Sequence, residues 1–138
     1  MPIKSSHSMA AIGAIVDGLP VQGFWEGDDV VNIVPVEDEG SLKIGADGSG
    51  IFSSYIDDSK QIELMLQPNS PTHRQLEQKL ARQNAGVPLP FPVSAFNLNS
   101  GENGDASNCY IMSQPDRAYG KEATVRKWVI IACDWRDV

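Results

Sequence analysis

The sequence has 138 residues, of which 41% are hydrophobic and 21% charged, and this composition excludes a wholly disordered chain. Its formal net charge of -7 argues against a protein that binds nucleic acid by neutralising phosphates. The length fits one domain with its own core, and no apolar run approaches the length of a transmembrane helix. The N-terminus lacks an apolar segment followed by a cleavage site, so we expect a soluble chain made in the cytoplasm.

The first nine residues are polar and are expected to form an arm, which leaves residues 10–138 as a single β-barrel domain. Two apolar runs, 10–16 and 19–25, flank Asp17-Gly18. An Asp-Gly pair in this position is typical of a β-hairpin, because both turn residues favour positive φ. Pro20 has no backbone N–H, so the second strand of this hairpin is expected at a sheet edge.

The stretch from residue 30 to residue 66 is predicted to form three successive strands. The first, 30–36, is β-branched and contains Pro35, which places that end at an edge or a bulge. The second run is 51–56. In the third, 61–67, apolar residues fall on every second position, as in a half-buried strand. A loop over residues 37–49 joins the first two, and a loop of that length is either disordered or functional.

The negative charge is concentrated in this stretch. Residues 26–58 contain one base, Lys43, and nine acids, which are Glu26, Asp28, Asp29, Glu37, Asp38, Glu39, Asp47, Asp57 and Asp58. The net charge of this stretch is therefore -8, against +1 for the rest of the chain. The simplest interpretation is a solubilising surface.

One helix is predicted, over residues 72–83. Asn69-Ser70-Pro71 supplies an N-cap side chain and a proline in the first turn, and residues 85–86 fit its end. Leu76 and Leu80 lie one turn apart. So narrow an apolar stripe indicates a helix packed on the outside of a sheet.

The C-terminal part is predicted to contain strands over 91–98, 107–113 and 125–135, with a turn over 99–105. Cys109 and Ile111 should point inward. Both faces of 128–133 are apolar, so the last strand is expected to be covered on both sides, and Cys109 and Cys133 to be buried free thiols. With roughly seven or eight strands and one helix, the fold class is mainly β: an antiparallel β-sandwich or barrel with one flanking α-helix.

No reaction centre is evident in the sequence. His7 and His73 are the only histidines, and no serine or cysteine lies in a nucleophile motif. The acids near Asp47 lack the spacing of a calcium loop, and the glycine-rich run 45–50 does not lead into a helix. No catalytic residue, metal or cofactor is expected. A sheet with open edges and a long loop instead favours assembly, because a closed ring leaves no free edge.

The run VEDEGSLKIGADGSGIFSSYIDDSKQIELMLQPNSPTHRQLEQKL resembles the tail tube proteins of contractile-tailed bacteriophages. The matching elements are Glu37-Asp38, Ile44 to Gly48 with Gly50, Ile62 to Leu66, and Ser70-Pro71 followed by Leu76 and Leu80. The similarity covers residues 30–83 and extends more loosely through the final strand, while the N-terminal arm has no counterpart.

The resemblance implies a tail-tube-like subunit that forms hexameric rings, which stack into a hollow tube in the virion tail after assembly in the host cytoplasm. Its implied partners are further copies of itself, a tail sheath protein, and tape-measure and baseplate or terminator proteins. Viral DNA would pass through an acidic lumen without specific binding, and no membrane is involved. The implied inter-ring loop contains Glu37, Asp38, Glu39, Lys43, Asp47 and Gly48, and the candidate lumen residues are Asp57, Asp58, Lys60 and Glu63.

Other interpretations remain open from the sequence. An acidic β-sandwich that recognises a basic partner would not self-associate. A small β-barrel enzyme would need a pocket that brings His73 together with some of the acids. Another virion protein, from the baseplate or the capsid surface, would differ chiefly in its partners. Pyocin and secretion-system tubes share the tail tube architecture.

Overall fold

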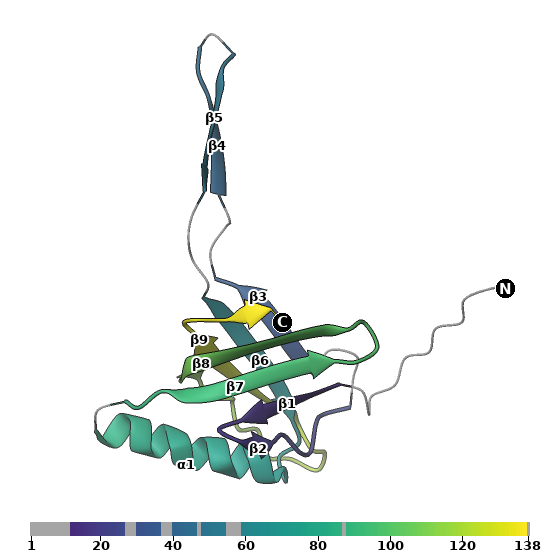
Figure 1. The fold of residues 1–138 in the computed structure, drawn as a ribbon. Coiled ribbons are helices and arrows are strands. Elements are labelled where there is room, and N and C mark those ends of the chain that lie inside the picture. Colours follow the sequence, from purple (N-terminus) through teal and green to yellow (C-terminus); the bar gives the residue numbers. More distant parts are fainter. Residues whose placement is uncertain are drawn as a thin grey trace, which may run out of the picture.

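The computed structural model describes residues 12–26, 30–36, 40–46, 48–54, 59–86 and 88–137, so the expected arm over residues 1–9 lies outside the described residues. Figure 1 shows two layers of antiparallel strands with one helix beneath them and a thin hairpin that projects from the other end. The elements are β1 (Ile12–Val16), β2 (Leu19–Pro20), β3 (Val31–Pro35), β4 (Gly40–Ile44), β5 (Gly50–Ser54), β6 (Lys60–Leu66), α1 (Pro71–Ala85), β7 (Phe91–Asn97), β8 (Glu102–Ser113), β9 (Arg126–Ala132) and β10 (Arg136–Asp137).

The main sheet has the strand order β2-β1-β7-β8-β9-β6-β3, and β10 also pairs with β8. Strand β8 belongs to both layers: its first half pairs with β7 and its second half with β9. The chain bends between these halves, where the backbone N–H groups of Ser107 and Asn108 donate to the carboxylate of Asp134. The predicted mainly β fold with one flanking helix is confirmed.

The core lies between the two layers and follows the predicted alternation. Ile62, Leu64 and Leu66 of β6 have no exposed surface, and they face the buried residues of β9 and β8. Cys109 and Ile111 point inward, as expected. Burying an aliphatic side chain of this size stabilises a fold by about 1.5–3 kcal/mol, so β6 anchors the sandwich.

Helix α1 begins and ends as predicted. The backbone N–H of His73 donates to the Ser70 side chain at 3.4 Å, Pro71 occupies the first turn, and Gly86 follows the last residue. Leu76 is buried against the core and Leu80 partly so. The start of the helix also requires Gly23, because a Cβ there would lie 2.8 Å from Cβ of Ser70. The helix is thus fixed to the sheet at its N-terminus.

The Asp-Gly hairpin is confirmed: Asp17 and Gly18 have φ values of 52° and 78°, and β2 is an edge strand. The second strand is shorter than expected. The Val21 N–H still donates to the Ala14 carbonyl of β1 at 2.9 Å, and the chain then crosses to β6, where the Trp25 N–H donates to the Met65 carbonyl at 2.9 Å. This crossing segment connects the two open ends of the sandwich.

The prediction of three strands and a loop within residues 30–66 was partly wrong. Strands β3 and β6 pair directly, and the chain between them includes β4 and β5, which form a sheet of their own. The supposed loop therefore contains a strand. Its glycines and acids concealed the alternation of Leu42 and Ile44, and the hairpin has no core to bury them in.

Three further expectations about the C-terminal part need correction. The outer side chains of β9, Val129 and Ile131, are half-buried, so the strand is not covered on both sides within the described chain. Cys133 is exposed, because it follows the last residue of β9. The turn after β7 is also shorter than 99–105, since β8 already begins at Glu102.

Candidate functional site

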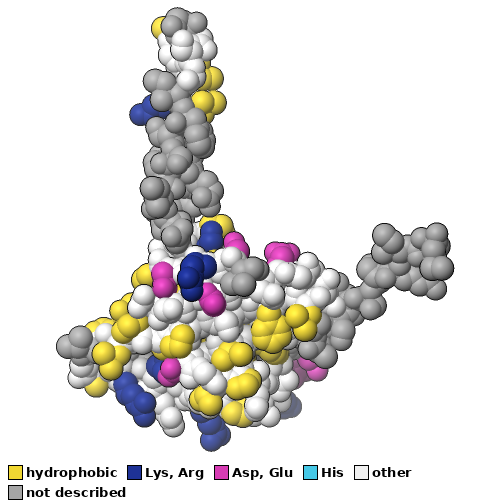
Figure 2. Space-filling view, viewed as in Figure 1, with side chains coloured by type: hydrophobic (Ala, Val, Ile, Leu, Met, Phe, Trp, Pro, Cys, Tyr) yellow, Lys and Arg dark blue, Asp and Glu magenta, His cyan; other side chains and the backbone are white. Residues whose placement is uncertain are grey.

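The β4–β5 hairpin presents an apolar stripe to solvent. Leu42 and Ile44 lie on one face of β4 and are 61% and 69% exposed, whereas Lys43 points to the other face. Figure 2 shows hydrophobic side chains along one side of the projecting arm and a basic side chain on the opposite side. Two neighbouring side chains this exposed, on an element with no core, are typical of a surface that another molecule covers.

The tip of the hairpin is closed by backbone contacts. The Gly45 N–H donates to the Ser49 carbonyl at 2.7 Å, and the Gly48 N–H donates to the Gly45 carbonyl at 3.0 Å. Gly48 has a φ of 87°, a value that glycine adopts readily. Of the expected inter-ring residues, the structure places Lys43 and Gly48 on this hairpin, whereas Glu37, Asp38, Glu39 and Asp47 lie outside the described residues.

The main sheet ends in β3 on one side and in β2 on the other. Among the described residues, β3 pairs with β6 only, and Ile33, Val34 and Val36 are exposed along it. A strand with one unpaired edge is a template for pairing with another chain. Pro35 removes one donor from that edge, as the sequence indicated.

The outer face of β3, β6 and β9 is close to neutral. Glu63 points outward and accepts a hydrogen bond from Lys127 at 2.9 Å, and its described neighbours on this face are uncharged: Asn32, Val34, Gln61, Met65, Val129 and Ile131. Lys60 is three positions from Glu63, so it points to the opposite face of β6. Of the four candidate lumen residues, Asp57 and Asp58 lie outside the described residues, and the other two do not share a face.

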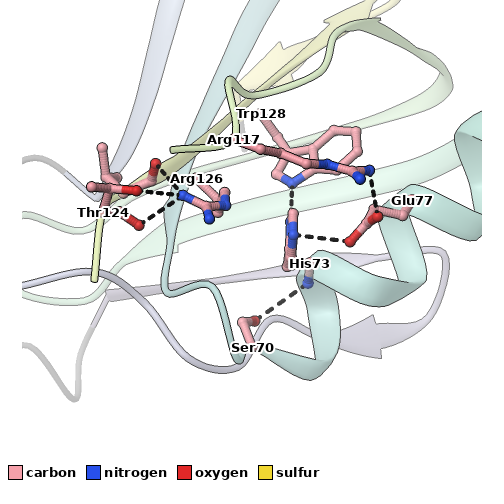
Figure 3. Close-up of polar contacts among 8 residues, drawn as sticks. Ser70, His73, Glu77, Arg117, Thr124, Arg126 and Trp128 are labelled. Carbon is pink, nitrogen blue, oxygen red and sulfur yellow. Dashed lines mark hydrogen bonds and ion pairs between the residues drawn. The ribbon is translucent and has the colours of Figure 1, made fainter. Parts of the chain in front are cut away.

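His73 connects helix α1 to the sheet (Figure 3). The indole N–H of Trp128 donates to Nδ1 of His73 at 2.9 Å, and Nε2 of His73 lies 2.9 Å from Glu77. The second oxygen of Glu77 accepts from Arg117 at 2.7 Å. This chain of contacts joins β9, α1 and the segment before β9, so its role is to hold the helix in place.

The histidine is neutral in this arrangement. Its Nδ1 accepts a hydrogen bond, so the proton of the neutral ring lies on Nε2 and is donated to Glu77. Burial lowers the pKa of His73 below its ordinary value of 6.5, Glu77 acts against this, and Arg126, Arg117 and Arg74 lower the pKa further. His73 is only 5% exposed, and among the described residues its side chain bonds to Trp128 and Glu77, so it lacks the open pocket that the enzyme interpretation requires.

A groove runs between α1 and the β1–β2 turn. It has a volume of about 150 Å³, with Val16, Leu19 and Leu76 as its apolar residues, and Asp17, Thr72, Gln75, Gln78, Lys79 and Arg82 as its polar ones. Lys79 forms an ion pair with Asp17 at 2.7 Å and lies over the ring of Phe91. This groove was not predictable from the sequence, because its residues come from two distant segments.

Neither a metal centre nor a membrane-spanning helix is found among the described residues. No group of three or more His, Cys, Asp or Glu side chains there has a geometry that would hold a metal ion. None of the described helical residues forms a helix long and apolar enough to cross a membrane.

Comparison with known proteins identifies the chain. Residues 6–137 match the family described as "Bacteriophage PhiTE tail tube protein". The chain belongs to this tail tube family. Curated proteins give no significant match. The family is one of structural tube proteins rather than enzymes, and it accounts for an exposed hairpin and open sheet edges in place of a catalytic centre.

Solved structures share the tail tube fold over almost the whole chain. A "PVC sheath/tube terminator in extended state" from an extracellular contractile injection system has 10% identity and a TM-score of 0.71, and covers 99% of both chains. The anti-feeding prophage cap, a tube terminating cap, has 11% identity, a TM-score of 0.65 and coverage of 100% and 94%. A PVC sheath-tube complex has 12% identity, a TM-score of 0.67 and coverage of 99% and 93%.

Proposed function

We propose that this tail tube protein forms hexameric rings that stack into a hollow tube within a contractile tail. The β4–β5 hairpin carries this proposal, because it projects from the body and exposes an apolar stripe that the subunit itself does not cover. A contact between the projecting end of one subunit and a different surface of the next is heterologous, and such contacts generate stacks.

Ring closure follows from the edges of the main sheet. The free edge of β3 and the edge at β1–β2 lie at the two ends of the strand order. Pairing of one edge with the opposite edge of a neighbour removes both, which is the usual way to protect an exposed strand. Ring closure therefore requires no contact from the hairpin, and the two kinds of assembly are separable.

The lumen is proposed to be lined by the central strands, with Glu63 on its surface and Asp57 and Asp58 close by. The sequence supports an acidic lining through Asp57 and Asp58, which lie in the acidic stretch 26–58 but outside the inter-ring loop. Negative charge would repel the phosphates of viral DNA and let the duplex pass without binding. Lys127 neutralises Glu63, so the proposed negative charge of the lumen has to come from other residues.

The proposed partners follow from the same assignment: a sheath protein around the tube, a tape-measure protein inside it, and baseplate and terminator proteins at its ends. Assembly is proposed in the host cytoplasm. A second candidate is a terminator that caps the tube, because two of the similar structures are terminating proteins. A terminator would form single rings but no extended stack.

The test is electron microscopy and sedimentation of the purified chain over a concentration series, with a hairpin deletion beside it. The Val36 N–H donates to the Ser59 carbonyl at 3.4 Å, so a two-residue turn can replace residues 37–58 without disturbing the pairing of β3 with β6. We expect tubes from the full chain and single rings from the deletion. Single rings from both would favour the terminator, and a strictly monomeric full chain would contradict both candidates.

A further inference from the structure

The hairpin and helix α1 lie at opposite ends of strand β6. The hairpin is inserted next to Lys60, the first residue of β6, and α1 begins shortly after Leu66, its last residue. Figure 1 shows the same arrangement, with β4–β5 above the sheets and α1 below them. Because subunits of a stack repeat in one direction, the hairpin end of one copy faces the α1 end of the next.

The α1 end offers a receptor of matching size. The groove between α1 and the β1–β2 turn has a volume of about 150 Å³, the size of a cavity that holds a benzene ring. Leu19 is 49% exposed beside it, and Val16 and Leu76 complete its apolar part. One aliphatic side chain would fill this space, and the hairpin presents two exposed ones, Leu42 and Ile44.

The α1 end is basic, and the sequence segment that contains the hairpin is acidic. Arg74, Gln78 and Arg82 form an exposed stripe at four-residue spacing on α1, and Lys79 lies beside them. The helix's one acid, Glu77, is held by His73 and Arg117. Residues 36–54, which contain the hairpin, carry four acids and one base in the sequence. Opposite charges at two meeting surfaces guide their association and fix its orientation.

The geometry points to the groove between α1 and the β1–β2 turn as the site that receives the β4–β5 hairpin of a second copy. Ile44 or Leu42 inserts beside Leu19, and the basic stripe of α1 faces the acidic hairpin segment. This inference rests on the proposed stacking and names the surface through which it occurs. Association should therefore weaken as salt rises, because Arg74 and Arg82 of α1 are exposed.

Cysteine cross-linking tests this inference. In a Cys133→Ser background, which removes the exposed thiol, Ile44→Cys is combined with Gln78→Cys, and a short bis-maleimide is added to the assembled protein. The matched control is Lys43→Cys with Gln78→Cys, which moves the hairpin thiol to the other face of the same strand. We expect a ladder of linked chains from the first pair, at least several-fold stronger than from the control.

The outcomes separate the inference from the proposed function. If microscopy shows tubes but the Ile44→Cys pair links no better than the control, the inference is wrong and the stacked tube stands. If neither the two cysteine variants nor the unsubstituted protein assembles at any concentration, the proposed function fails and the inference fails with it. As a second measurement, Gln78→Trp, which places a bulky ring in the groove from the α1 side and leaves the β1–β2 edge unchanged, should leave single rings while shortening or abolishing tubes. Tubes of normal length from that variant would also overturn the inference.

Discussion

The indole N–H of Trp128 and Nδ1 of His73 lie 2.9 Å apart, and this one hydrogen bond joins the central strand β9 to helix α1. Both side chains are almost fully buried. If one of the two groups were removed, water could not reach the other to replace it as a hydrogen-bond partner. The bond is therefore worth more to the fold than a similar bond at the surface.

Trp128→Phe should lower the free energy of unfolding. The substitution leaves Nδ1 of His73 without a donor, which costs about 1–3 kcal/mol, and the smaller ring adds a cavity term. Urea unfolding followed by circular dichroism measures the change. Tyr119→Phe is the control, because Tyr119 is 84% exposed and its hydroxyl should contribute less than about 0.5 kcal/mol. Equal stability of the two variants would show that the buried bond contributes nothing.

Stability should decrease as the pH falls below about 6.5. The unfolded chain protonates His73 near pH 6.5, whereas the lowered pKa in the folded chain delays protonation to a lower pH. In that interval the unfolded state holds more protons, so the free energy of unfolding falls with decreasing pH. Above pH 6.5 the full contribution of His73 to the free energy of unfolding is present. His73→Gln should flatten this dependence, because the variant retains every other titratable group. An unchanged slope in the variant would assign the effect to other groups.

Gly104→Ala should destabilise the protein strongly. A Cβ at this position would lie 2.1 Å from Cζ2 of Trp135, and Gly104 is paired with Ala95 in the middle of a sheet. Overpacking of this kind typically costs about 1–3 kcal/mol. The control is Gly120→Ala, because no atom lies within 4 Å of a Cβ at Gly120. Thermal unfolding of the two variants should show a lower Tm for the first alone.

The two cysteines should differ in reactivity. Burial raises the pKa of Cys109 to about 12, so its thiolate is scarce at neutral pH, whereas Cys133 is exposed. An aromatic disulfide reagent should therefore titrate one thiol quickly in the folded protein and two after denaturation. Cys133→Ser should abolish the fast reaction. A fast reaction that persists in that variant would mean that Cys109 is accessible.

The sequence predicted most of the sandwich because alternation, caps and turn residues act locally. The Asp17-Gly18 turn, the Ser70 cap and the buried side of β6 each depend on a few neighbouring residues. The β4–β5 hairpin was less predictable, because its apolar residues face solvent and its glycines and acids are typical of a loop. Lys60 and Glu63 are three positions apart on β6 and therefore point to opposite faces. The grouping of both as lumen residues did not take this spacing into account.

The contact groups were the least predictable part. The Trp128–His73 bond joins residues 55 positions apart, and the groove beside α1 combines the β1–β2 turn with the helix. Such contacts depend on how elements pack rather than on any local pattern. The exposure of Cys133 was likewise missed, because apolar neighbours in the sequence did not reveal where β9 ends.

The shared strand β8 has a mechanical consequence. Its backbone is bonded to β7 along one half and to β9 along the other, so the two layers cannot slide apart as separate plates. Backbone bonds of antiparallel strands run across the strand direction, so a pull along the strands loads many of them at once. Force that enters at β3 or β6 is thereby distributed over the ladder as far as β1. A subunit built in this way yields as a whole rather than one strand at a time.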